Sequence, residues 1–187
     1  MRIASRATRL AAQISLLVAL LSTGVFVMLR SYLDDDERLF GEGRINQVVS
    51  KGPVTVGKVD WQLDSLQAYN ALVDDKGEKI SLDQPAGSVI ILATLTVTPR
   101  PGVRLKDHGF SCAAVLRDDR GNVWQSQQAF GFALPTYCTD DDHPFDLDKP
   151  GKLAQIYVVP ASAVPHLTGV VVENLDERNR ILITLAQ

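Results

Sequence analysis

The densest group of chemically versatile side chains is the segment Thr139–Asp148, TDDDHPFDLD, which holds five carboxylates and one histidine in ten residues. Calcium prefers several carboxylate oxygens on a flexible loop, so the candidate ligands are Asp140, Asp142 and Asp146. The spacing departs from that of an EF-hand, because Pro144 stands where a ligand would be and no glycine provides the sharp turn. The segment therefore favours a solvated acidic loop, with calcium binding as the alternative and no other cofactor expected.

Cys112 and Cys138 are the two cysteines of the chain. In an exported domain such a pair predicts one disulfide, and two buried unpaired thiols are the alternative. Neither cysteine has a second ligand at zinc-like spacing, which argues against a metal pair.

The sequence carries no recognisable catalytic signature. His108, His143 and His166 are scattered, and the chain contains no H-E-x-x-H, G-x-S-x-G or G-x-x-x-x-G-K motif. The pairs Asp74–Asp75 and Asp118–Asp119 each precede a glycine closely, which is typical of turns rather than of glycosidase acid and base groups. We therefore expect no enzymatic activity.

Residues 10–29, LAAQISLLVALLSTGVFVML, contain no charge and no proline. A helix of this length spans ~30 Å, about the hydrocarbon thickness of a bilayer. The run predicts one transmembrane helix. Gln13 is a candidate hydrogen-bonding residue toward a partner helix, and Ser15 lies on a stripe of small residues that also contains Ala11 and Ala19.

The segment before this run, residues 1–9, carries three arginines and no acid, which is typical of a cytoplasmic flank. A short basic segment, an apolar run and then a whole domain is the layout of a signal anchor. We therefore expect a single-pass protein of the cell membrane whose C-terminal domain is extracytoplasmic. Secretion after cleavage is the alternative, although no A-x-A pattern ends the run.

Residues 30–53 are expected to form a juxtamembrane stalk, because glycines and the sequence Lys51-Gly52-Pro53 interrupt them before the domain begins. Residues 54–187 carry 12 basic and 17 acidic side chains. This balance argues against a nucleic-acid partner, which would need a basic face.

From residue 54 the apolar pattern has the period of two that is typical of strands. Val59, Trp61 and Leu63 alternate with polar residues, and Ser88–Thr98 is β-branched and apolar on both faces, as in the centre of a sheet. Further strands are expected at Leu153–Val159, Thr168–Val172 and Arg180–Ala186. Beyond residue 53 only Ser162–Leu167 could form a helical turn. About eight strands without intervening helices predict an antiparallel β-sandwich.

Two hairpins are predicted around acidic turns that contain glycine. Their paired segments are Tyr69–Val73 with Glu78–Leu82, and Ser111–Arg117 with Asn122–Gln127. The segment Ala129–Tyr137, AFGFALPTY, is expected to be another strand with Phe130, Phe132 and Leu134 toward the core. Its alternative is an apolar loop that docks a partner or lipid.

The order of four segments resembles the immunoglobulin-like domains of exported Gram-positive, actinobacterial proteins, of the mycobacterial immunoprotective extracellular antigen type. These segments are VDWQLDSL at 59–66, PAGSVIILATLTV at 85–97, VLRDDRGNVW at 115–124 and DKPGKLAQIYVVP at 148–160. The resemblance implies an all-β, immunoglobulin-like antiparallel sandwich, a cell-surface or exported location and no catalytic site.

Three functions follow as hypotheses. The first is a binding or assembly module that contacts another envelope or membrane protein through the sandwich. The second is an accessory subunit of a membrane transporter or envelope complex, with the transmembrane helix making the contact. The third is a secreted calcium-dependent binder or enzyme that uses the acidic loop.

Overall fold

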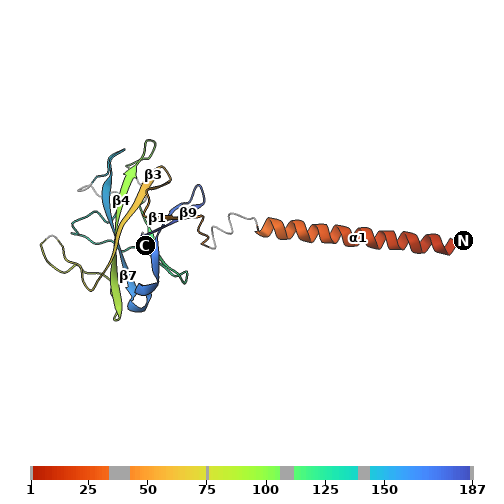
Figure 1. Cartoon of the computed structure of the whole chain (residues 1–187), viewed down its shortest axis with the longest axis horizontal. Helices are drawn as coiled ribbons and strands as arrows, with labels where there is room; N and C mark the ends of the chain where they lie inside the picture. The colour runs from red at the N-terminus through yellow and green to blue at the C-terminus, as the bar shows by residue number, and fades with distance from the viewer. Residues whose placement is uncertain (1, 34–42, 75, 106–111, 139–143, 186–187) are drawn as a thin grey trace. The chain divides into compact units, whose positions relative to one another are not determined.

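The computed structural model describes residues 2–33, 43–74, 76–105, 112–138 and 144–185. The chain divides into two compact units, Met1–Gly43 and Arg44–Gln187, and some of the elements of each are labelled in Figure 1. In chain order the elements of the described residues are α1 (Arg2–Leu33), β1 (Gln47–Ser50), β2 (Val54–Val56), β3 (Val59–Tyr69), β4 (Ser88–Pro99), β5 (Val115–Asp118), β6 (Val123–Trp124), β7 (Gly151–Pro160), the 3-10 helix η1 (Ala161–His166), β8 (Leu167–Asn174) and β9 (Asn179–Thr184).

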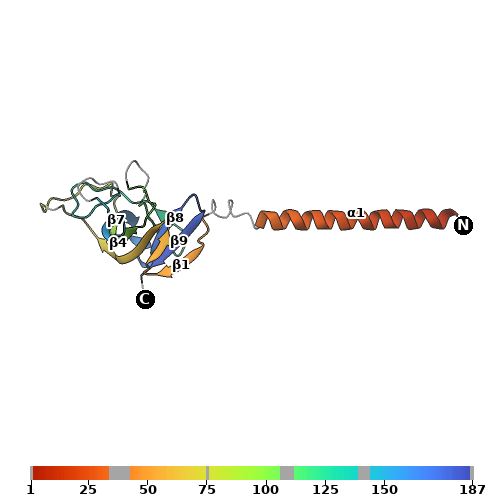
Figure 2. The ribbon, with the colours of Figure 1, turned by 90° about the horizontal axis from the view of Figure 1, so that it is seen from above.

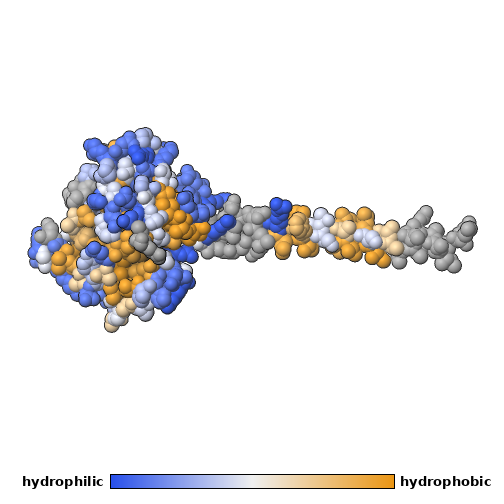
Figure 3. Space-filling model, viewed as in Figure 1, coloured by the Kyte–Doolittle hydropathy of each residue, from blue (hydrophilic) through white to orange (hydrophobic). Residues whose placement is uncertain are grey.

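The helix α1 contains the predicted apolar run. Between Ala11 and Arg30 its mean hydropathy is 2.1 and none of the window is buried, and Figure 3 shows apolar residues along this part of the helix. The hydroxyl groups of Ser22 and Thr23 donate to backbone carbonyls four residues earlier, at 2.8 and 2.9 Å. These bonds satisfy the two hydroxyls inside the helix. By its length and composition the segment is suited to cross a bilayer or to act as a signal sequence.

The second unit is a two-sheet β-sandwich, as predicted. One sheet has the strand order β1-β9-β8-β5-β6 and the other the order β2-β3-β4-β7. Figure 2 shows β4 and β7 apart from the layer that contains β1, β8 and β9. β3 and β4 are the longest strands, and their antiparallel register places Trp61 opposite Val97 and Leu63 opposite Leu95.

The prediction that residues 30–53 form a stalk is wrong at its C-terminal end, because β1 lies within this range and belongs to the sandwich. The sandwich therefore begins before residue 54. Gln47–Ser50 pairs with Ile181–Thr184 of β9, and the two strands are parallel. The sheets are therefore not purely antiparallel. Gly43 and the Gly52-Pro53 break isolate a strand of only four residues, which is too short to show a period of two convincingly.

The main core lies between the two sheets. From one side β3 and β4 contribute side chains that are completely buried or nearly so, among them Trp61, Leu63 and Leu95. From the other side the facing side chains include Val170 of β8 and Ile183 of β9. Alternation along the first part of β3 and the second part of β4 produces this arrangement, because every second residue of a strand points to the same face.

Two buried polar side chains of β7 cross this core. The hydroxyl of Tyr157 donates to the carbonyl of Ala114 at 2.9 Å. Gln155 donates to the carbonyl of Thr136 at 3.2 Å and accepts from the backbone N–H of Ala114 at 3.4 Å. Burial raises the pKa of Tyr157 far above its ordinary value, so its hydroxyl remains a donor. Polar groups that are buried in this way stabilise the fold only when they are paired.

Both predicted hairpin turns are present, although their paired segments are shorter than expected. In each turn the first aspartate, Asp74 or Asp118, accepts through Oδ1 from backbone N–H groups two and four residues further on. Desolvation would raise the pKa of Asp118, but hydrogen bonds from the side chain and backbone of Asn122 and the backbone of Arg120 outweigh it, and the pKa lies below its usual value.

The prediction of a strand over Ala129–Tyr137 is wrong. Only Gln127, just before this segment, forms a bridge, to Ile156. Gly131 adopts a positive φ of 75°, and such a residue interrupts extended pairing. Phe130 is 80% exposed, whereas Ala129 is buried and Phe132 packs against a second apolar cluster with Ile90 and Ile156. The segment is a loop over the outer face of the β4–β7 pair.

Candidate functional site

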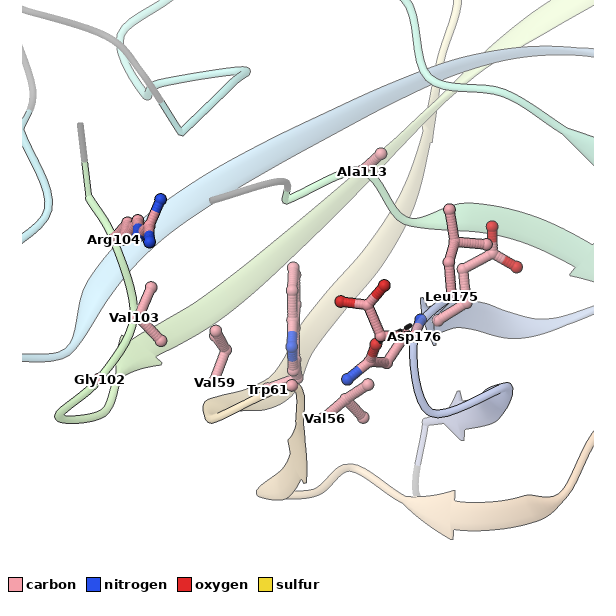
Figure 4. Close-up of a pocket in the computed structure, with 12 residues that line it drawn as sticks. Val56, Val59, Trp61, Gly102, Val103, Arg104, Ala113, Leu175 and Asp176 are labelled. Atoms are coloured by element: carbon pink, nitrogen blue, oxygen red, sulfur yellow. Dashed lines mark hydrogen bonds between the residues drawn. The ribbon is translucent and has the colours of Figure 1, made fainter. Parts of the chain in front are cut away.

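A pocket of about 500 Å³ opens at one end of the sandwich. Four separate parts of the chain line it: β2 and β3 with the turn between them, the segment after β4, the residue before Ala114, and the β8–β9 turn. Its apolar side chains include Val56, Val59, Trp61 and Val103, and Figure 4 shows Trp61 in the middle of the lining residues. A volume of this size lies within the range of ~300–1,000 Å³ that is typical of ligand sites.

Trp61 carries a hydrogen-bond donor that has no partner among the described residues, although the residue is only 4% exposed. Among the described residues that are not exposed, each side-chain nitrogen or oxygen atom that is completely hidden from solvent has a hydrogen-bond partner. The indole nitrogen of Trp61 therefore keeps some exposure to solvent, and the residue lines the pocket. A buried tryptophan ordinarily finds a partner for this group, so the donor is available to a ligand.

Asn174 supplies a second available donor. Its Oδ1 accepts from the backbone N–H groups of Asp176 and Glu177 at 3.0 and 3.3 Å, which fixes the turn between β8 and β9. Within the described part of the chain no group accepts from its Nδ2. Gly57 keeps the space beside this nitrogen open, because a Cβ at that position would lie 3.1 Å from it.

Two charged side chains of opposite sign lie on the rim. Arg104 and Asp176 are exposed and line the pocket, and neither side chain has an ion-pair partner in the described ranges. Figure 4 shows them on opposite sides of Trp61. Glu173 also lines the pocket, but Arg180 binds its carboxylate at 2.8 Å. The pocket thus combines an apolar floor, two open donors and one unpaired charge of each sign.

The predicted disulfide is present, since Cys112 and Cys138 are bonded. Cys112 lies two positions before Ala114, whose backbone is bonded by Gln155 and Tyr157. Cys138 lies two positions after Thr136, whose carbonyl accepts from Gln155. The disulfide therefore has a structural position and leaves no free thiol for chemistry among the described residues.

Only one of the three proposed calcium ligands lies in the part of the chain that the structure describes. Asp140 and Asp142 lie outside the described residues. Asp146 is exposed and forms an ion pair with Lys149 at 2.9 Å. Among the described residues no three acidic, histidine or cysteine side chains are grouped to hold a metal ion.

The two candidate contact residues in the apolar helix both lie in α1. Gln13 and Ser15 are exposed along this helix. Within the described residues the side-chain amide of Gln13 has no hydrogen-bond partner. Such an amide in hydrocarbon favours association with a polar group of another helix.

His166 lies in the arrangement that comes nearest to catalytic geometry. Its Nδ1 lies 3.2 Å from Oδ2 of Asp119, as in an acid–histidine pair, but its Nε2 contacts the guanidinium of Arg120. An arginine can only donate, so Nε2 accepts and the proton is on Nδ1. Both ring nitrogens are therefore occupied, and among the described residues no nucleophile contacts His166 as a Ser-His-Asp site requires. His108 and His143 lie outside the described residues.

Sequence reasoning missed the pocket, because its residues come from four distant segments. Trp61 was identified only as a core residue of a strand. One local signal was available: Gly57 follows the short run VTV, and glycine at a tight turn leaves space for neighbouring groups.

The chain matches no protein-family model, and it matches no curated protein. Among solved structures it is similar to an uncharacterized β-sandwich protein from Clostridium difficile 630, whose crystal structure is known at 1.90 Å resolution. The two chains are 12% identical, with a TM-score of 0.47 over 76% of this chain and 95% of that one. No function accompanies this similarity.

Proposed function

We propose that the chain is a membrane-anchored extracytoplasmic binding module without catalytic activity, and that the pocket around Trp61 is its binding site. The observation that carries this proposal is the available indole N–H beside the apolar floor of the pocket. A ligand with a suitable acceptor could pair this donor, whereas a ligand that covered it without an acceptor would leave it unpaired at a cost in free energy.

The proposed location rests on three features of the chain. An apolar helix is suited to span or to be cleaved as a signal, a basic segment precedes it, and the sandwich contains a disulfide. Disulfides persist in oxidising compartments. We propose that the helix remains as an uncleaved anchor, and that the sandwich is immunoglobulin-like and related to the exported domains that its sequence resembles.

The proposal is tested by capture of partners from membranes. The full chain is purified in mild detergent, and the co-purifying proteins are identified for the wild type and two variants. In the first, Leu10–Leu29 is replaced by an unrelated apolar helix. In the second, Arg104→Asp and Asp176→Arg exchange the rim charges. The proposal is supported if the variant with the replaced helix still captures a partner that the variant with exchanged rim charges no longer captures.

A matched control exchanges another exposed pair, Asp146→Lys with Lys149→Asp, which lies outside the pocket lining. Unchanged capture by the rim variant would refute a role for the pocket. Loss of the partner with the helix replacement alone would instead support the alternative, an accessory subunit that acts through its transmembrane helix. That alternative is favoured by the unpaired amide of Gln13 in α1.

A further inference from the structure

We infer that the pocket around Trp61 binds a peptide segment of a partner protein. The segment would place an apolar side chain against the valines, with an acidic side chain toward Arg104 and a basic one toward Asp176. This inference rests on the proposed function and names the class of ligand that the binding module recognises.

The first argument is the chemistry of the available donors. The indole N–H of Trp61 and the Nδ2 group of Asn174 both lack an acceptor within the described residues. Both residues line the same pocket. A peptide backbone presents one carbonyl per residue, at intervals of ~3.5 Å, and therefore supplies acceptors next to any side chain that enters the pocket.

The second argument is the apolar floor beside these donors. Val56 and Val59 are each 4% exposed, and they line the pocket with Val103 and the indole ring. Because these side chains are already almost hidden, the gain would come mainly from the ligand. An aliphatic or aromatic side chain that enters the pocket would itself leave water, at about 25 cal/mol per Å² of its apolar area. A wholly polar or phosphate-bearing ligand would leave that contribution unused.

The third argument is the pair of rim charges. Arg104 and Asp176 lie on opposite sides of Trp61 (Figure 4), and both are exposed. Because the rim is exposed, the ends of a bound segment can continue into solvent, as a protein chain requires and an enclosed small molecule does not. Opposite charges on the two sides also define a direction for the segment, since like charges in contact are unfavourable.

The test is a selection from a phage-displayed library of random linear heptapeptides against the full chain in nanodiscs, with empty nanodiscs as the background. We expect enriched sequences to contain an apolar residue with an acid on one side and a base on the other, in one preferred order. The combined variant Arg104→Asp and Asp176→Arg should enrich the opposite order. The exchange of Asp146 and Lys149 should leave the order unchanged.

A second measurement uses a synthetic form of the most enriched peptide. Trp61→Phe retains an aromatic ring but removes the donor, so we expect about fivefold weaker binding by fluorescence anisotropy, the effect of one hydrogen bond worth ~1 kcal/mol. The peptide inference would be overturned if no peptide were enriched over empty nanodiscs. It would also be overturned if the wild type and the rim-charge variant enriched the same order of acidic and basic residues. If the rim-charge variant still lost its partner in the capture from membranes, the proposed function would stand without the peptide inference. If that variant kept the partner, the proposed function would be refuted whichever peptides bind.

Discussion

Removal of the Cys112–Cys138 disulfide should destabilise the sandwich by a calculable amount. The bonded residues are 26 positions apart, and closure of a loop of that length in the unfolded chain corresponds to about 3.5 kcal/mol in the chain-entropy model. A unit of about 140 residues unfolds with an entropy of ~0.3 kcal/mol/K. The double variant Cys112→Ala and Cys138→Ala should therefore melt about 12 °C below the wild type.

Intrinsic tryptophan fluorescence is the appropriate signal, because both tryptophans, Trp61 and Trp124, lie in the sandwich and none lies in α1. The melt is recorded with and without a thiol reductant. Reductant should bring the wild type down to the midpoint of the double variant and leave the double variant unchanged. Equal midpoints for the two proteins without reductant would refute the stabilisation argued here.

Three further changes have defined outcomes. Tyr157→Phe leaves the buried carbonyl of Ala114 without its donor, so the free energy of unfolding in urea should fall by about 1–3 kcal/mol. Gly169→Ala places a Cβ 2.1 Å from the carbonyl oxygen of Ile183 in the adjacent strand, so the variant purified in detergent should melt well below the wild type, or without a cooperative transition, by tryptophan fluorescence. Asp118 has a lowered pKa in the folded state, so its stabilising effect is complete above the ordinary value of about 3.9 and is lost as the pH falls through the lowered one. Asp118→Ala should therefore be less stable than the wild type in urea at pH 7, and the difference should shrink below pH 4.

The parts of the fold that follow from local pattern were predictable from the sequence. Alternation around Trp61 indicated a strand with one buried face, and Asp118 with its following glycine indicated a hairpin turn. Both are properties of residues close together in the chain. The spacing of two in Ala129–Tyr137 gave the same signal, but Gly131 and the packing of Phe132 against a second apolar cluster produced a loop instead.

Features that depend on distant pairing could not be predicted in the same way. Nothing in Gln47–Ser50 by itself indicates that it lies beside β9, more than 130 positions later. The pocket depends on such pairing too, since β2 and the β8–β9 turn must come together before Trp61 and Asn174 can line one space. Their unpaired donors become visible only when all neighbouring groups are known.

The pairing of β1 with β9 has a mechanical consequence for a domain held by an N-terminal anchor. A pull through the proposed anchor would reach the sandwich at Asn46 and β1, and four registered residue pairs connect this strand to β9. Because the two strands are parallel, tension between the start of β1 and the end of β9 acts along the ladder in shear. The hydrogen bonds would then have to break together rather than one after another. We expect this geometry to resist stretching better than a hairpin that opens from one end.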